Sequence, residues 1–515
     1  MSSRAMSLAL AVAVLLLAGG APAWSQEQAA LPYEKCEVPL PDLEEPWTKQ
    51  EEWVWTRVCE GEKADLNERK DGSRIDPEKK WELEDDRIIS ERFLKTILLR
   101  APYREAIPEN GVWIVGALFE EELDLSSARI DADLFIEASR FKAPVSFVGT
   151  EFKRHAGFID SRFEKKLNLA AVHARKYLFL GEGAQFAEVN LNSANVDGNV
   201  VMRRARFTGP LHMDSIQVGG LLLMRDTEFV SVDLPNARIE GQVSTDGAKF
   251  TCALNMDGTQ VGGSLYMRGT HFENELILFG SEISGALQFS NGEREASWGE
   301  GASLDLRQAR LQVIEISEGS LPKKNAENPR PLKLEGLQYQ RLVTYAGADE
   351  VNTWNADEYR THWLEKSEFS SQAYKQLADA LEREDRSDVA AEILYASKEK
   401  QWARAEGLRW FNLTLQKYLI GYGYRLYQAL FWFGWFVGLG ALVHLRVKAK
   451  LKQGLADLAA SLFFSFDWLI PVLKLDEVHY EEPIPGWRRY YFGAHILIGF
   501  VLVSFILAGV SGLTK

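Results

Sequence analysis

One ionisable side chain lies inside an apolar stretch near the C-terminus, and this is where the sequence could support ion binding. Asp467 interrupts the apolar segment 455–475, and a carboxylate in such surroundings is costly and often functional. Neighbouring residues could complete a site for an ion or a lipid headgroup: Trp468, Pro471, Asp476, Glu477 and His479. The alternative is a structural role, in which Asp467 caps a helix where the apolar region meets water.

Histidine and cysteine supply the other candidate groups. His444 and His495 fall near the ends of two apolar stretches, where they could pair, bind a metal or simply lie at an interface. Cys36 and Cys59 could form a disulfide if the chain leaves the cytoplasm, although their spacing alone does not decide this. Cys252 is predicted to point into the core as a small apolar side chain.

The sequence contains no recognisable catalytic motif. G-x-S-x-G, the Walker A sequence, H-E-x-x-H and C-x-x-C are all absent. Gly-Gly pairs such as Gly219-Gly220 lie in repeated turns and not between a strand and a helix, so they do not form a dinucleotide-binding loop. We therefore expect no enzymatic activity, no cofactor and no metal.

The elements that would position these groups follow from a repeat in the middle of the chain. Large apolar residues recur every 11 positions, which indicates a stack of similar structural units. One series is Leu125, Ile136, Phe147, Phe158, Leu169, Leu180, Leu191, Met202, Met213 and Met224, and after a slip of one position it continues at Leu234, Thr245, Met256, Met267, Leu278 and Phe289. The second series is Phe119, Ile130, Phe141, Phe152, Phe163, Phe186, Val196, Phe207, Val218, Phe229, Ile239, Phe250, Val261, Phe272 and Ile283.

Each unit is predicted to contain short strands with one buried face. A small residue two positions before the second series, and an apolar residue two positions before the first, give the period-2 alternation of a strand. Turn residues such as Gly219-Gly220 and Gly262-Gly263 recur at every second unit, so one coil takes two units, or 22 residues. About eight coils at roughly 4.8 Å of rise give a rod about 40 Å long.

This rhythm resembles that of the pentapeptide-repeat proteins. The resembling triplets are Ala194-Asn195-Val196, Ala205-Arg206-Phe207 and Ala237-Arg238-Ile239, and the likeness covers about residues 111–290. The coil is 22 residues long, whereas the family pattern gives 20. The resemblance implies a four-sided, right-handed β-helix.

Three shorter pieces are similar to bacterial membrane-anchored members of that family. They are Arg92-Phe93-Leu94 leading to Gly111-Val112-Trp113-Ile114, the segment Tyr374-Lys375-Gln376-Leu377-Ala378, and Phe466-Asp467-Trp468-Leu469-Ile470-Pro471-Val472. The resemblance therefore implies a β-helix attached to a bacterial membrane.

The N-terminal part reads as an export signal followed by a cap. Residues 1–25 contain Arg4, an apolar run from Leu8 to Leu17 and small residues before a cleavage site, which is typical of a secretory signal peptide. An uncleaved anchor is the alternative. Residues 26–110 are predicted to cap the solenoid, which would otherwise expose an open edge, and 111–340 to form the solenoid with loop insertions.

The C-terminal part is predicted to be helical and embedded in a membrane. Residues 356–405 change to helical periodicity and form a helical hairpin. The membrane domain covers 406–515, with spans at about 429–446 and 491–513. The intervening segment 455–475 could be a third span, a re-entrant hairpin or an interfacial helix.

Charge favours one orientation of this domain. Four basic residues follow the first span, which places that end inside the cell and the solenoid in the periplasm of a bacterial inner membrane: Arg446, Lys448, Lys450 and Lys452. Basic residues also precede the span, and the predicted signal peptide decides in favour of this orientation. Acidic Asp476-Glu477 and Glu481-Glu482 then favour the outer side and three crossings, and two crossings stay open.

Composition and pattern together favour an interaction protein. The chain has 515 residues, 46% of them hydrophobic, and a net charge of −14, with no basic stripe for nucleic acid. The leading hypothesis is a membrane-anchored scaffold or spacer that binds a protein partner, with a homo-oligomer left open. An ion channel or transporter with a β-helical sensor and pore-lining segment 455–475 is the alternative. A carbohydrate-active β-helix enzyme is the lesser alternative.

Overall fold

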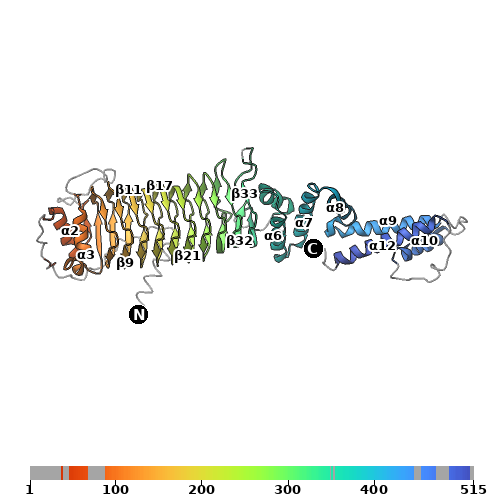
Figure 1. Cartoon of the computed structure of the whole chain (residues 1–515), viewed down its shortest axis with the longest axis horizontal. Helices are drawn as coiled ribbons and strands as arrows, with labels where there is room; N and C mark the ends of the chain where they lie inside the picture. Colours follow the sequence, from red (N-terminus) through yellow and green to blue (C-terminus); the bar gives the residue numbers. More distant parts are fainter. Residues whose placement is uncertain are drawn as a thin grey trace, which may run out of the picture.

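The fold is an elongated rod in which a helical cap, a β-solenoid, a helical hairpin and a group of apolar helices follow one another along one axis (Figure 1). The computed structural model describes Cys36, Val38 and residues 46–67, 87–326, 328–347, 350–351, 354–445, 454–470 and 486–510. The predicted signal peptide over 1–25 and the predicted site residues Pro471, Asp476, Glu477 and His479 lie outside the described residues.

The solenoid consists of short strands that pair in parallel with the next coil. One sheet contains β1 (Ala64–Asp65), β2 (Val112–Val115), β5 (Arg129–Ile130), β6 (Leu134–Glu137), β9 (Glu151–Phe152), β10 (Ala156–Ile159), β12 (His173–Ala174), β13 (Leu178–Phe179), β15 (Asn195–Val196), β16 (Val200–Val201), β18 (Gln217–Val218), β19 (Leu222–Leu223), β21 (Arg238–Ile239), β22 (Val243–Ser244), β25 (Gln260–Val261), β26 (Leu265–Tyr266), β29 (Glu282–Gln288), β32 (Arg310–Ser317) and β34 (Gln338–Tyr345). The other contains β3 (Leu118–Phe119), β4 (Leu123–Asp124), β7 (Arg140–Phe141), β8 (Val145–Ser146), β11 (Arg162–Asn168), β14 (Gln185–Asn190), β17 (Arg206–His212), β20 (Glu228–Asp233), β23 (Lys249–Phe250), β24 (Leu254–Asn255), β27 (His271–Phe272), β28 (Leu276–Ile277), β30 (Ser297–Trp298), β31 (Leu304–Asp305) and β33 (Leu332–Lys333).

The two predicted apolar series form the core, and every member of both is buried. One aromatic ring per coil stacks on the ring of the next coil, with centroids 4.2–5.5 Å apart. This aromatic ladder contains Phe119, Phe141, Phe163, Phe186, Phe207, Phe229, Phe250, Phe272 and Trp298. The spacing matches the separation of paired strands, so each ring contacts its equivalent one coil away.

The 22-residue coil and its slip are both confirmed by the strand register. Phe207 pairs with Phe229, 22 positions later, whereas Phe229 pairs with Phe250, 21 positions later. The register of β17 against β20 shifts between Phe207 and Pro210. A local bulge therefore absorbs the missing residue, and the core positions on both sides stay aligned.

The small residue in each unit has a structural reason. It is buried at a corner of the coil, directly after a residue with positive φ, for example Thr150 after Gly149 and Thr259 after Gly258. The hydroxyl of Thr259 donates to the Leu234 carbonyl oxygen at 2.8 Å, and five other buried hydroxyls make the same bond: Thr150, Ser161, Thr227, Thr270 and Ser281. A large side chain at this position would displace the neighbouring coil.

Glycine allows neighbouring coils to approach closely at another corner. A Cβ atom on Gly241 would lie 2.4 Å from the Gly220 carbonyl oxygen, and one on Gly262 would lie 2.3 Å from that of Glu240. No side chain fits at such distances, so the recurring glycine turns are required by packing between coils.

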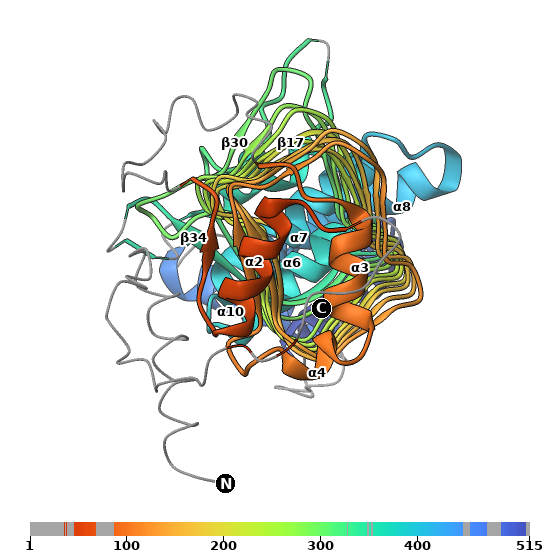
Figure 2. The same cartoon turned by 90° about the vertical axis from the view of Figure 1, so that its left-hand side faces the viewer.

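Helices close the first end of the solenoid. In the end-on view, α2 (Lys49–Cys59) and α3 (Glu91–Leu99) lie across the open end, with the short α4 (Tyr103–Ala106) beside them (Figure 2). Trp47 packs on Phe93, and Trp55 packs on Tyr103, with ring centroids 5.0 and 5.3 Å apart. Cys36 and Cys59 form a disulfide that links the chain before α2 to the end of that helix.

The helical hairpin closes the other end. It follows the short turns α5 (Ala356–Glu358), η3 (Tyr359–Trp363) and η4 (Leu364–Lys366), and it consists of α6 (Ser371–Arg383) and α7 (Ser387–Trp402). The Gly336 amide donates to the Gln372 side chain at 2.8 Å, and Gln376 donates to the Tyr339 carbonyl at 2.5 Å. Two glutamines of α6 therefore satisfy backbone groups of the last coil, in β34 and just before it.

The remaining helices form the narrow end of the rod. They are α8 (Gly407–Ile420), the turn η5 (Gly421–Gly423), α9 (Leu426–Leu445), α10 (Gly454–Leu469) and α12 (Arg488–Val510). α9, α10 and α12 pack against one another side by side. Within the described residues, one helical segment, Tyr427–Leu445 of α9, is long and apolar enough to cross a membrane.

The prediction for Cys252 is wrong. Its side chain is exposed and carries a free thiol. It follows the buried Phe250 by two positions, but β23 ends at Phe250 and the chain bends there. The alternation of inward and outward side chains applies only within the strand, so the corner turns Cys252 towards solvent.

Candidate functional site between three apolar helices

The predicted carboxylate lies inside the helical end of the rod. Asp467 belongs to the last turn of α10, and its side chain is 0% exposed. Trp468 beside it is partly buried, with its ring 5.6 Å from that of Phe492 on α12. The structure therefore places Asp467 within the packed helices and not on their surface.

Both predicted histidines are buried in the same group of helices. His444 of α9 contacts Ser461 of α10, with 3.1 Å between Nδ1 and Oγ. His495 of α12 contacts Ser465 of α10, with 3.3 Å between Nε2 and Oγ. The histidines therefore do not pair with each other, because each meets a different serine of the central helix. We call His444, Ser461, Ser465 and His495 the polar seam.

The protonation of His495 follows from its second partner. Its Nε2 atom also lies 3.2 Å from the Ser465 carbonyl oxygen, which can only accept a hydrogen bond. Nε2 therefore carries the proton and donates it, which leaves Nδ1 as the acceptor of the neutral ring. That Nδ1 atom is buried without a hydrogen-bond partner among the described residues.

Glycines allow the three helices to bring these groups together. A Cβ atom on Gly440 would lie 2.2 Å from Ser465 Oγ, and one on Gly499 would lie 1.7 Å from the Leu469 carbonyl oxygen. Close approach of backbones through small residues is the common way in which helices associate in apolar surroundings. The polar seam is thus part of the packing interface of α9, α10 and α12.

Sequence reasoning missed Ser461, Ser465, Gly440 and Gly499. A signal for them exists, because each helix carries two small or polar residues four positions apart. These pairs are Gly440–His444 on α9, Ser461–Ser465 on α10 and His495–Gly499 on α12. Residues with this spacing share one face of a helix, so the spacing marks a candidate contact face on each helix but does not say which faces meet.

The seam suits helix association better than catalysis. A serine hydroxyl beside a histidine is the arrangement of an activated nucleophile, but Ser465 is 0% exposed and lies in the contact between helices. In addition, Nε2 of His495 donates to a carbonyl and cannot accept the serine proton in that state. Within the described part of the chain, no group of three or more metal-binding side chains occurs.

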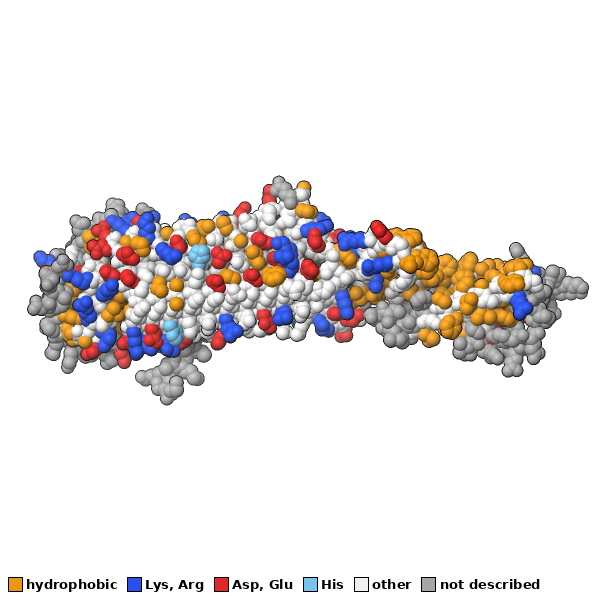
Figure 3. Space-filling view, in the orientation of Figure 1, with side chains coloured by type: hydrophobic (Ala, Val, Ile, Leu, Met, Phe, Trp, Pro, Cys, Tyr) orange, Lys and Arg blue, Asp and Glu red, His pale blue; other side chains and the backbone are white. Residues whose placement is uncertain are grey.

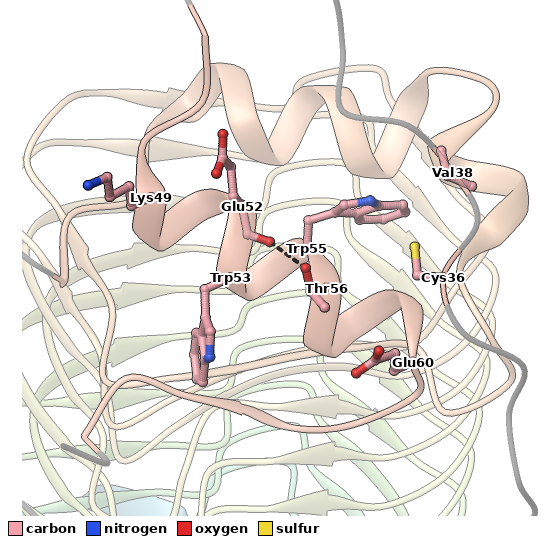
Figure 4. A pocket seen from close by; sticks show the side chains of 8 residues that line it. All are labelled: Cys36, Val38, Lys49, Glu52, Trp53, Trp55, Thr56 and Glu60. Atoms are coloured by element: carbon pink, nitrogen blue, oxygen red, sulfur yellow. Dashed lines mark hydrogen bonds between the residues drawn. The ribbon is translucent and has the colours of Figure 1, made fainter. Parts of the chain in front are cut away.

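Two of the hollows that the described residues form lie elsewhere, and neither brings together a recognisable set of catalytic side chains. The first, of about 500 Å³, lies beside α2 in the cap, where side chains from successive turns point in different directions (Figure 4). The second, of about 460 Å³, lies where the hairpin meets Arg425. Several of its charged groups form ion pairs, for example Arg360 with Asp357 and Lys400 with Glu365.

The outer surface of the solenoid carries mixed charge. Opposite charges pair between neighbouring coils, as in Arg140–Glu164, Lys142–Glu120 and Arg206–Glu228. Blue and red patches alternate along the rod, and neither sign forms a continuous stripe on the visible face (Figure 3). Neither sign of charge is therefore concentrated on this face of the solenoid.

The surface changes abruptly after the hairpin. Twenty-one large apolar side chains are exposed among the described residues, and nineteen of them lie between Leu408 and Leu507. The two exceptions are Phe279 and Val351. Figure 3 shows the apolar surface covering the narrow end of the rod. Exposed apolar surfaces of this extent commonly mark sites of contact with a membrane or with another protein.

Comparisons with known proteins do not add an identity. No family model, no curated protein and no solved structure matches this chain.

Proposed function

We propose that this chain is a membrane-anchored scaffold of the bacterial envelope, in which the solenoid acts as a spacer and as a binding surface for a protein partner. The observation that carries the proposal is the change of surface at Leu408, from mixed charge on the solenoid to exposed apolar side chains on the last helices. One region is suited to water, and the other is suited to lipid.

The proposed location is the inner membrane, with the solenoid in the periplasm. The predicted signal peptide over 1–25 supports export. The Cys36–Cys59 disulfide also supports it, because such bonds persist in oxidising compartments. The scaffold works without catalysis, through the long and repetitive surface that stacked coils provide.

Cys252 provides a direct test of location, because it is an exposed free thiol on the solenoid. A membrane-impermeant maleimide is added to cells with a permeabilised outer membrane, before and after lysis. We expect labelling of Cys252 before lysis, and no labelling of the Cys252→Ser variant. Carbonate extraction of the same cells should leave the full chain in the membrane pellet. Labelling only after lysis, or release by carbonate, contradicts the proposal.

The partner is tested by photocrosslinking from the solenoid. Arg238 and Lys249 are exposed and belong to different sheets of the solenoid, so they sample two faces. A photoreactive amino acid at each position should give a discrete adduct from at least one face in living cells. If neither position, nor others on the same faces, gives an adduct, the binding role is wrong and only the anchor remains.

One observation favours ion conduction as a second candidate. Asp467 is a fully buried carboxylate among helices whose outer surfaces are apolar, and such residues often line ion or proton pathways. The measurement is ionic current through bilayers containing the full chain, for the wild type and for Asp467→Asn. A current that the substitution alters supports a channel. Silence from intact protein under several ions and voltages leaves the scaffold.

A further inference from the structure

Helix α8 exposes one apolar face in front of the first apolar helix of the bundle. Leu408, Phe411, Leu415 and Tyr418 recur at spacings of three and four residues, so they lie on one side of the helix. Their exposed fractions are 87%, 56%, 44% and 60%. Nothing within the described chain covers this face, which we call the outer face of α8.

The opposite side of α8 is fastened to its neighbours. Leu413 and Ile420 are buried. Trp402 of α7 donates to the Thr414 hydroxyl at 2.9 Å, and Lys417 lies 2.6 Å from the Glu399 carboxylate. The exposure of the outer face is therefore not a sign of a loose helix, because the contacts with α7 fix which side faces outward.

The direction of α8 differs from that of the helices that follow it. The chain turns sharply at Gly421 and Tyr422, which both have positive φ, and then enters α9. In the view along the rod, α8 extends sideways beyond the outline of the solenoid, whereas α9 runs along the rod in the side view (Figures 1 and 2). Trp432 of α9 donates to the Tyr418 carbonyl at 2.8 Å and holds this angle.

The charge around α8 is opposite to that of the chain as a whole. Residues 403–425 contain four basic residues, Arg404, Arg409, Lys417 and Arg425, and one acidic residue, Glu406, which gives a net charge of +3. The whole chain has a net charge of −14. Arg404, Arg409 and Arg425 are exposed. Basic groups beside an apolar helix face are complementary to a bilayer that contains anionic lipid.

We propose that α8 is an interfacial helix that lies in the plane of the bilayer surface. Its outer face would lie among the upper acyl chains, and the exposed Arg404, Arg409 and Arg425 would lie among anionic headgroups. This inference rests on the proposed membrane anchoring of α9. It commits to a lipid surface as the occupant, because basic side chains accompany the apolar face and because α9, which packs against α8, also exposes the apolar residues Tyr427, Leu430 and Phe431. The helix would then hold the solenoid upright at a fixed height above the membrane.

The test measures depth in a bilayer along α8. The full chain with Cys252→Ser is reconstituted into nanodiscs of phosphatidylcholine and phosphatidylglycerol, with single spin labels at Phe411, Leu415, Asn412 or Gln416. Power saturation compares contact with oxygen, which concentrates in acyl chains, and with a water-soluble nickel chelate. We expect labels at 411 and 415 to be oxygen-accessible and nickel-protected by at least a factor of three relative to 412 and 416. Labels at Leu430 and Trp435 of α9 serve as the anchor control.

The outcomes separate the inference from the proposed function. If the control labels at Leu430 and Trp435 of α9 contact lipid but all four α8 labels contact water equally, the interfacial role of α8 is wrong and the anchor stands. If labels at 411 and 415 are shielded from both reagents, a protein surface covers the outer face and the inference is also wrong. If 430 and 435 contact water as well, the membrane anchoring itself fails.

A second measurement tests the charged part of the proposal. In discs of phosphatidylcholine alone, labels at 411 and 415 should lie closer to the surface than in discs with phosphatidylglycerol. The double substitution Arg404→Gln and Arg409→Gln should remove this difference between the two lipid compositions. If the labels at 411 and 415 lie at the same depth in both lipid compositions while Arg404 and Arg409 are present, a role for anionic headgroups is contradicted.

Discussion

The solenoid and the last helices both contain many aromatic residues, but they place them in opposite ways. The solenoid stacks its rings inside, from Phe119 to Trp298, and covers them with paired charges. The last helices direct Trp435, Phe463 and Phe500 outward and keep histidine, serine and aspartate inside. The first arrangement is stable in water by its own packing. The second leaves apolar side chains uncovered, as expected under the proposed membrane anchoring.

The largest expected effect comes from placing a charge in the aromatic ladder. In Phe207→Asp, the buried ring and its two stacking contacts are replaced by a carboxylate with no partner. We expect a loss of about 5 kcal/mol or more, enough to unfold the solenoid, because truncation of a buried Phe alone costs about 3–5 kcal/mol. Circular dichroism and thermal unfolding of the full chain in detergent measure this. Leu430→Asp on the exposed side of α9 is the control and should leave the β signal unchanged. Wild-type melting of Phe207→Asp would contradict the assigned register.

The second effect concerns a cation buried at the junction of the two regions. Burial lowers the pKa of Lys366 from its ordinary 10.5 to about 8, although Glu318 acts in the opposite direction. The unfolded chain therefore binds more protons than the folded chain between about pH 8 and 10.5, and stability rises with pH across this window. Lys366→Met should stabilise the chain by about 3 kcal/mol at pH 7 and by nothing above about pH 10.5. The free energy of unfolding of the wild type and of Lys366→Met is measured at pH 7 and above about pH 10.5. An equal difference between the two proteins at both pH values would show that the charge of Lys366 is not the cause.

The third effect tests the close packing of the bundle. Gly440→Ala places a methyl group 2.2 Å from Ser465 Oγ, whereas a Cβ on Gly438 of the same helix meets nothing within 4 Å. We expect Gly440→Ala to destabilise the bundle by about 2 kcal/mol and Gly438→Ala to have little effect. Cross-linking between cysteines placed on α9 and α12 in detergent reports the loss. Equal behaviour of the two variants would mean that the helices do not meet at Gly440.

The smallest effect tests the buried hydroxyls of the solenoid. Thr259→Val removes the 2.8 Å bond to the Leu234 carbonyl and leaves that oxygen buried. The expected cost is about 1–2 kcal/mol. Thr251→Val is the matched control, because its hydroxyl also donates to a carbonyl but its side chain is exposed to water. Thermal unfolding should separate the two variants, and a larger loss for Thr251→Val would overturn this explanation of the small residue.

The sequence predicted the solenoid in detail, because its order is local and repeated. Each coil must place the same kind of side chain above the last one, so Phe207, Phe229 and Phe250 reveal their contacts by spacing alone. The slip at Leu234 also follows from the sequence, because the inward positions resume on its far side, and Leu211 pairs with Val232 only 21 positions later. The outward direction of Cys252 was not predicted, because the alternation ends with the strand and the corner sets the next direction.

The candidate site was predicted only in part. Asp467, His444 and His495 stood out as polar residues in apolar segments, and the structure buries all three. Their neighbours did not stand out, because Ser461 and Ser465 are ordinary residues until α9 and α12 pack against α10. The capping role of Gln372 and Gln376 escaped notice for the same reason: it depends on where α6 meets the last coil.

By itself, the amino-acid sequence determined the coil length, the inward residues and the apolar segments of the last helices. These properties depend on periodicity and on the transfer of side chains out of water, which are both fixed along the chain. Only the tertiary structure decided that each histidine meets its own serine, that the hairpin closes the solenoid and that α8 lies across the axis with one face uncovered. Those features arise from contacts between separate elements, and helix periodicity limits which faces can meet without choosing the partner.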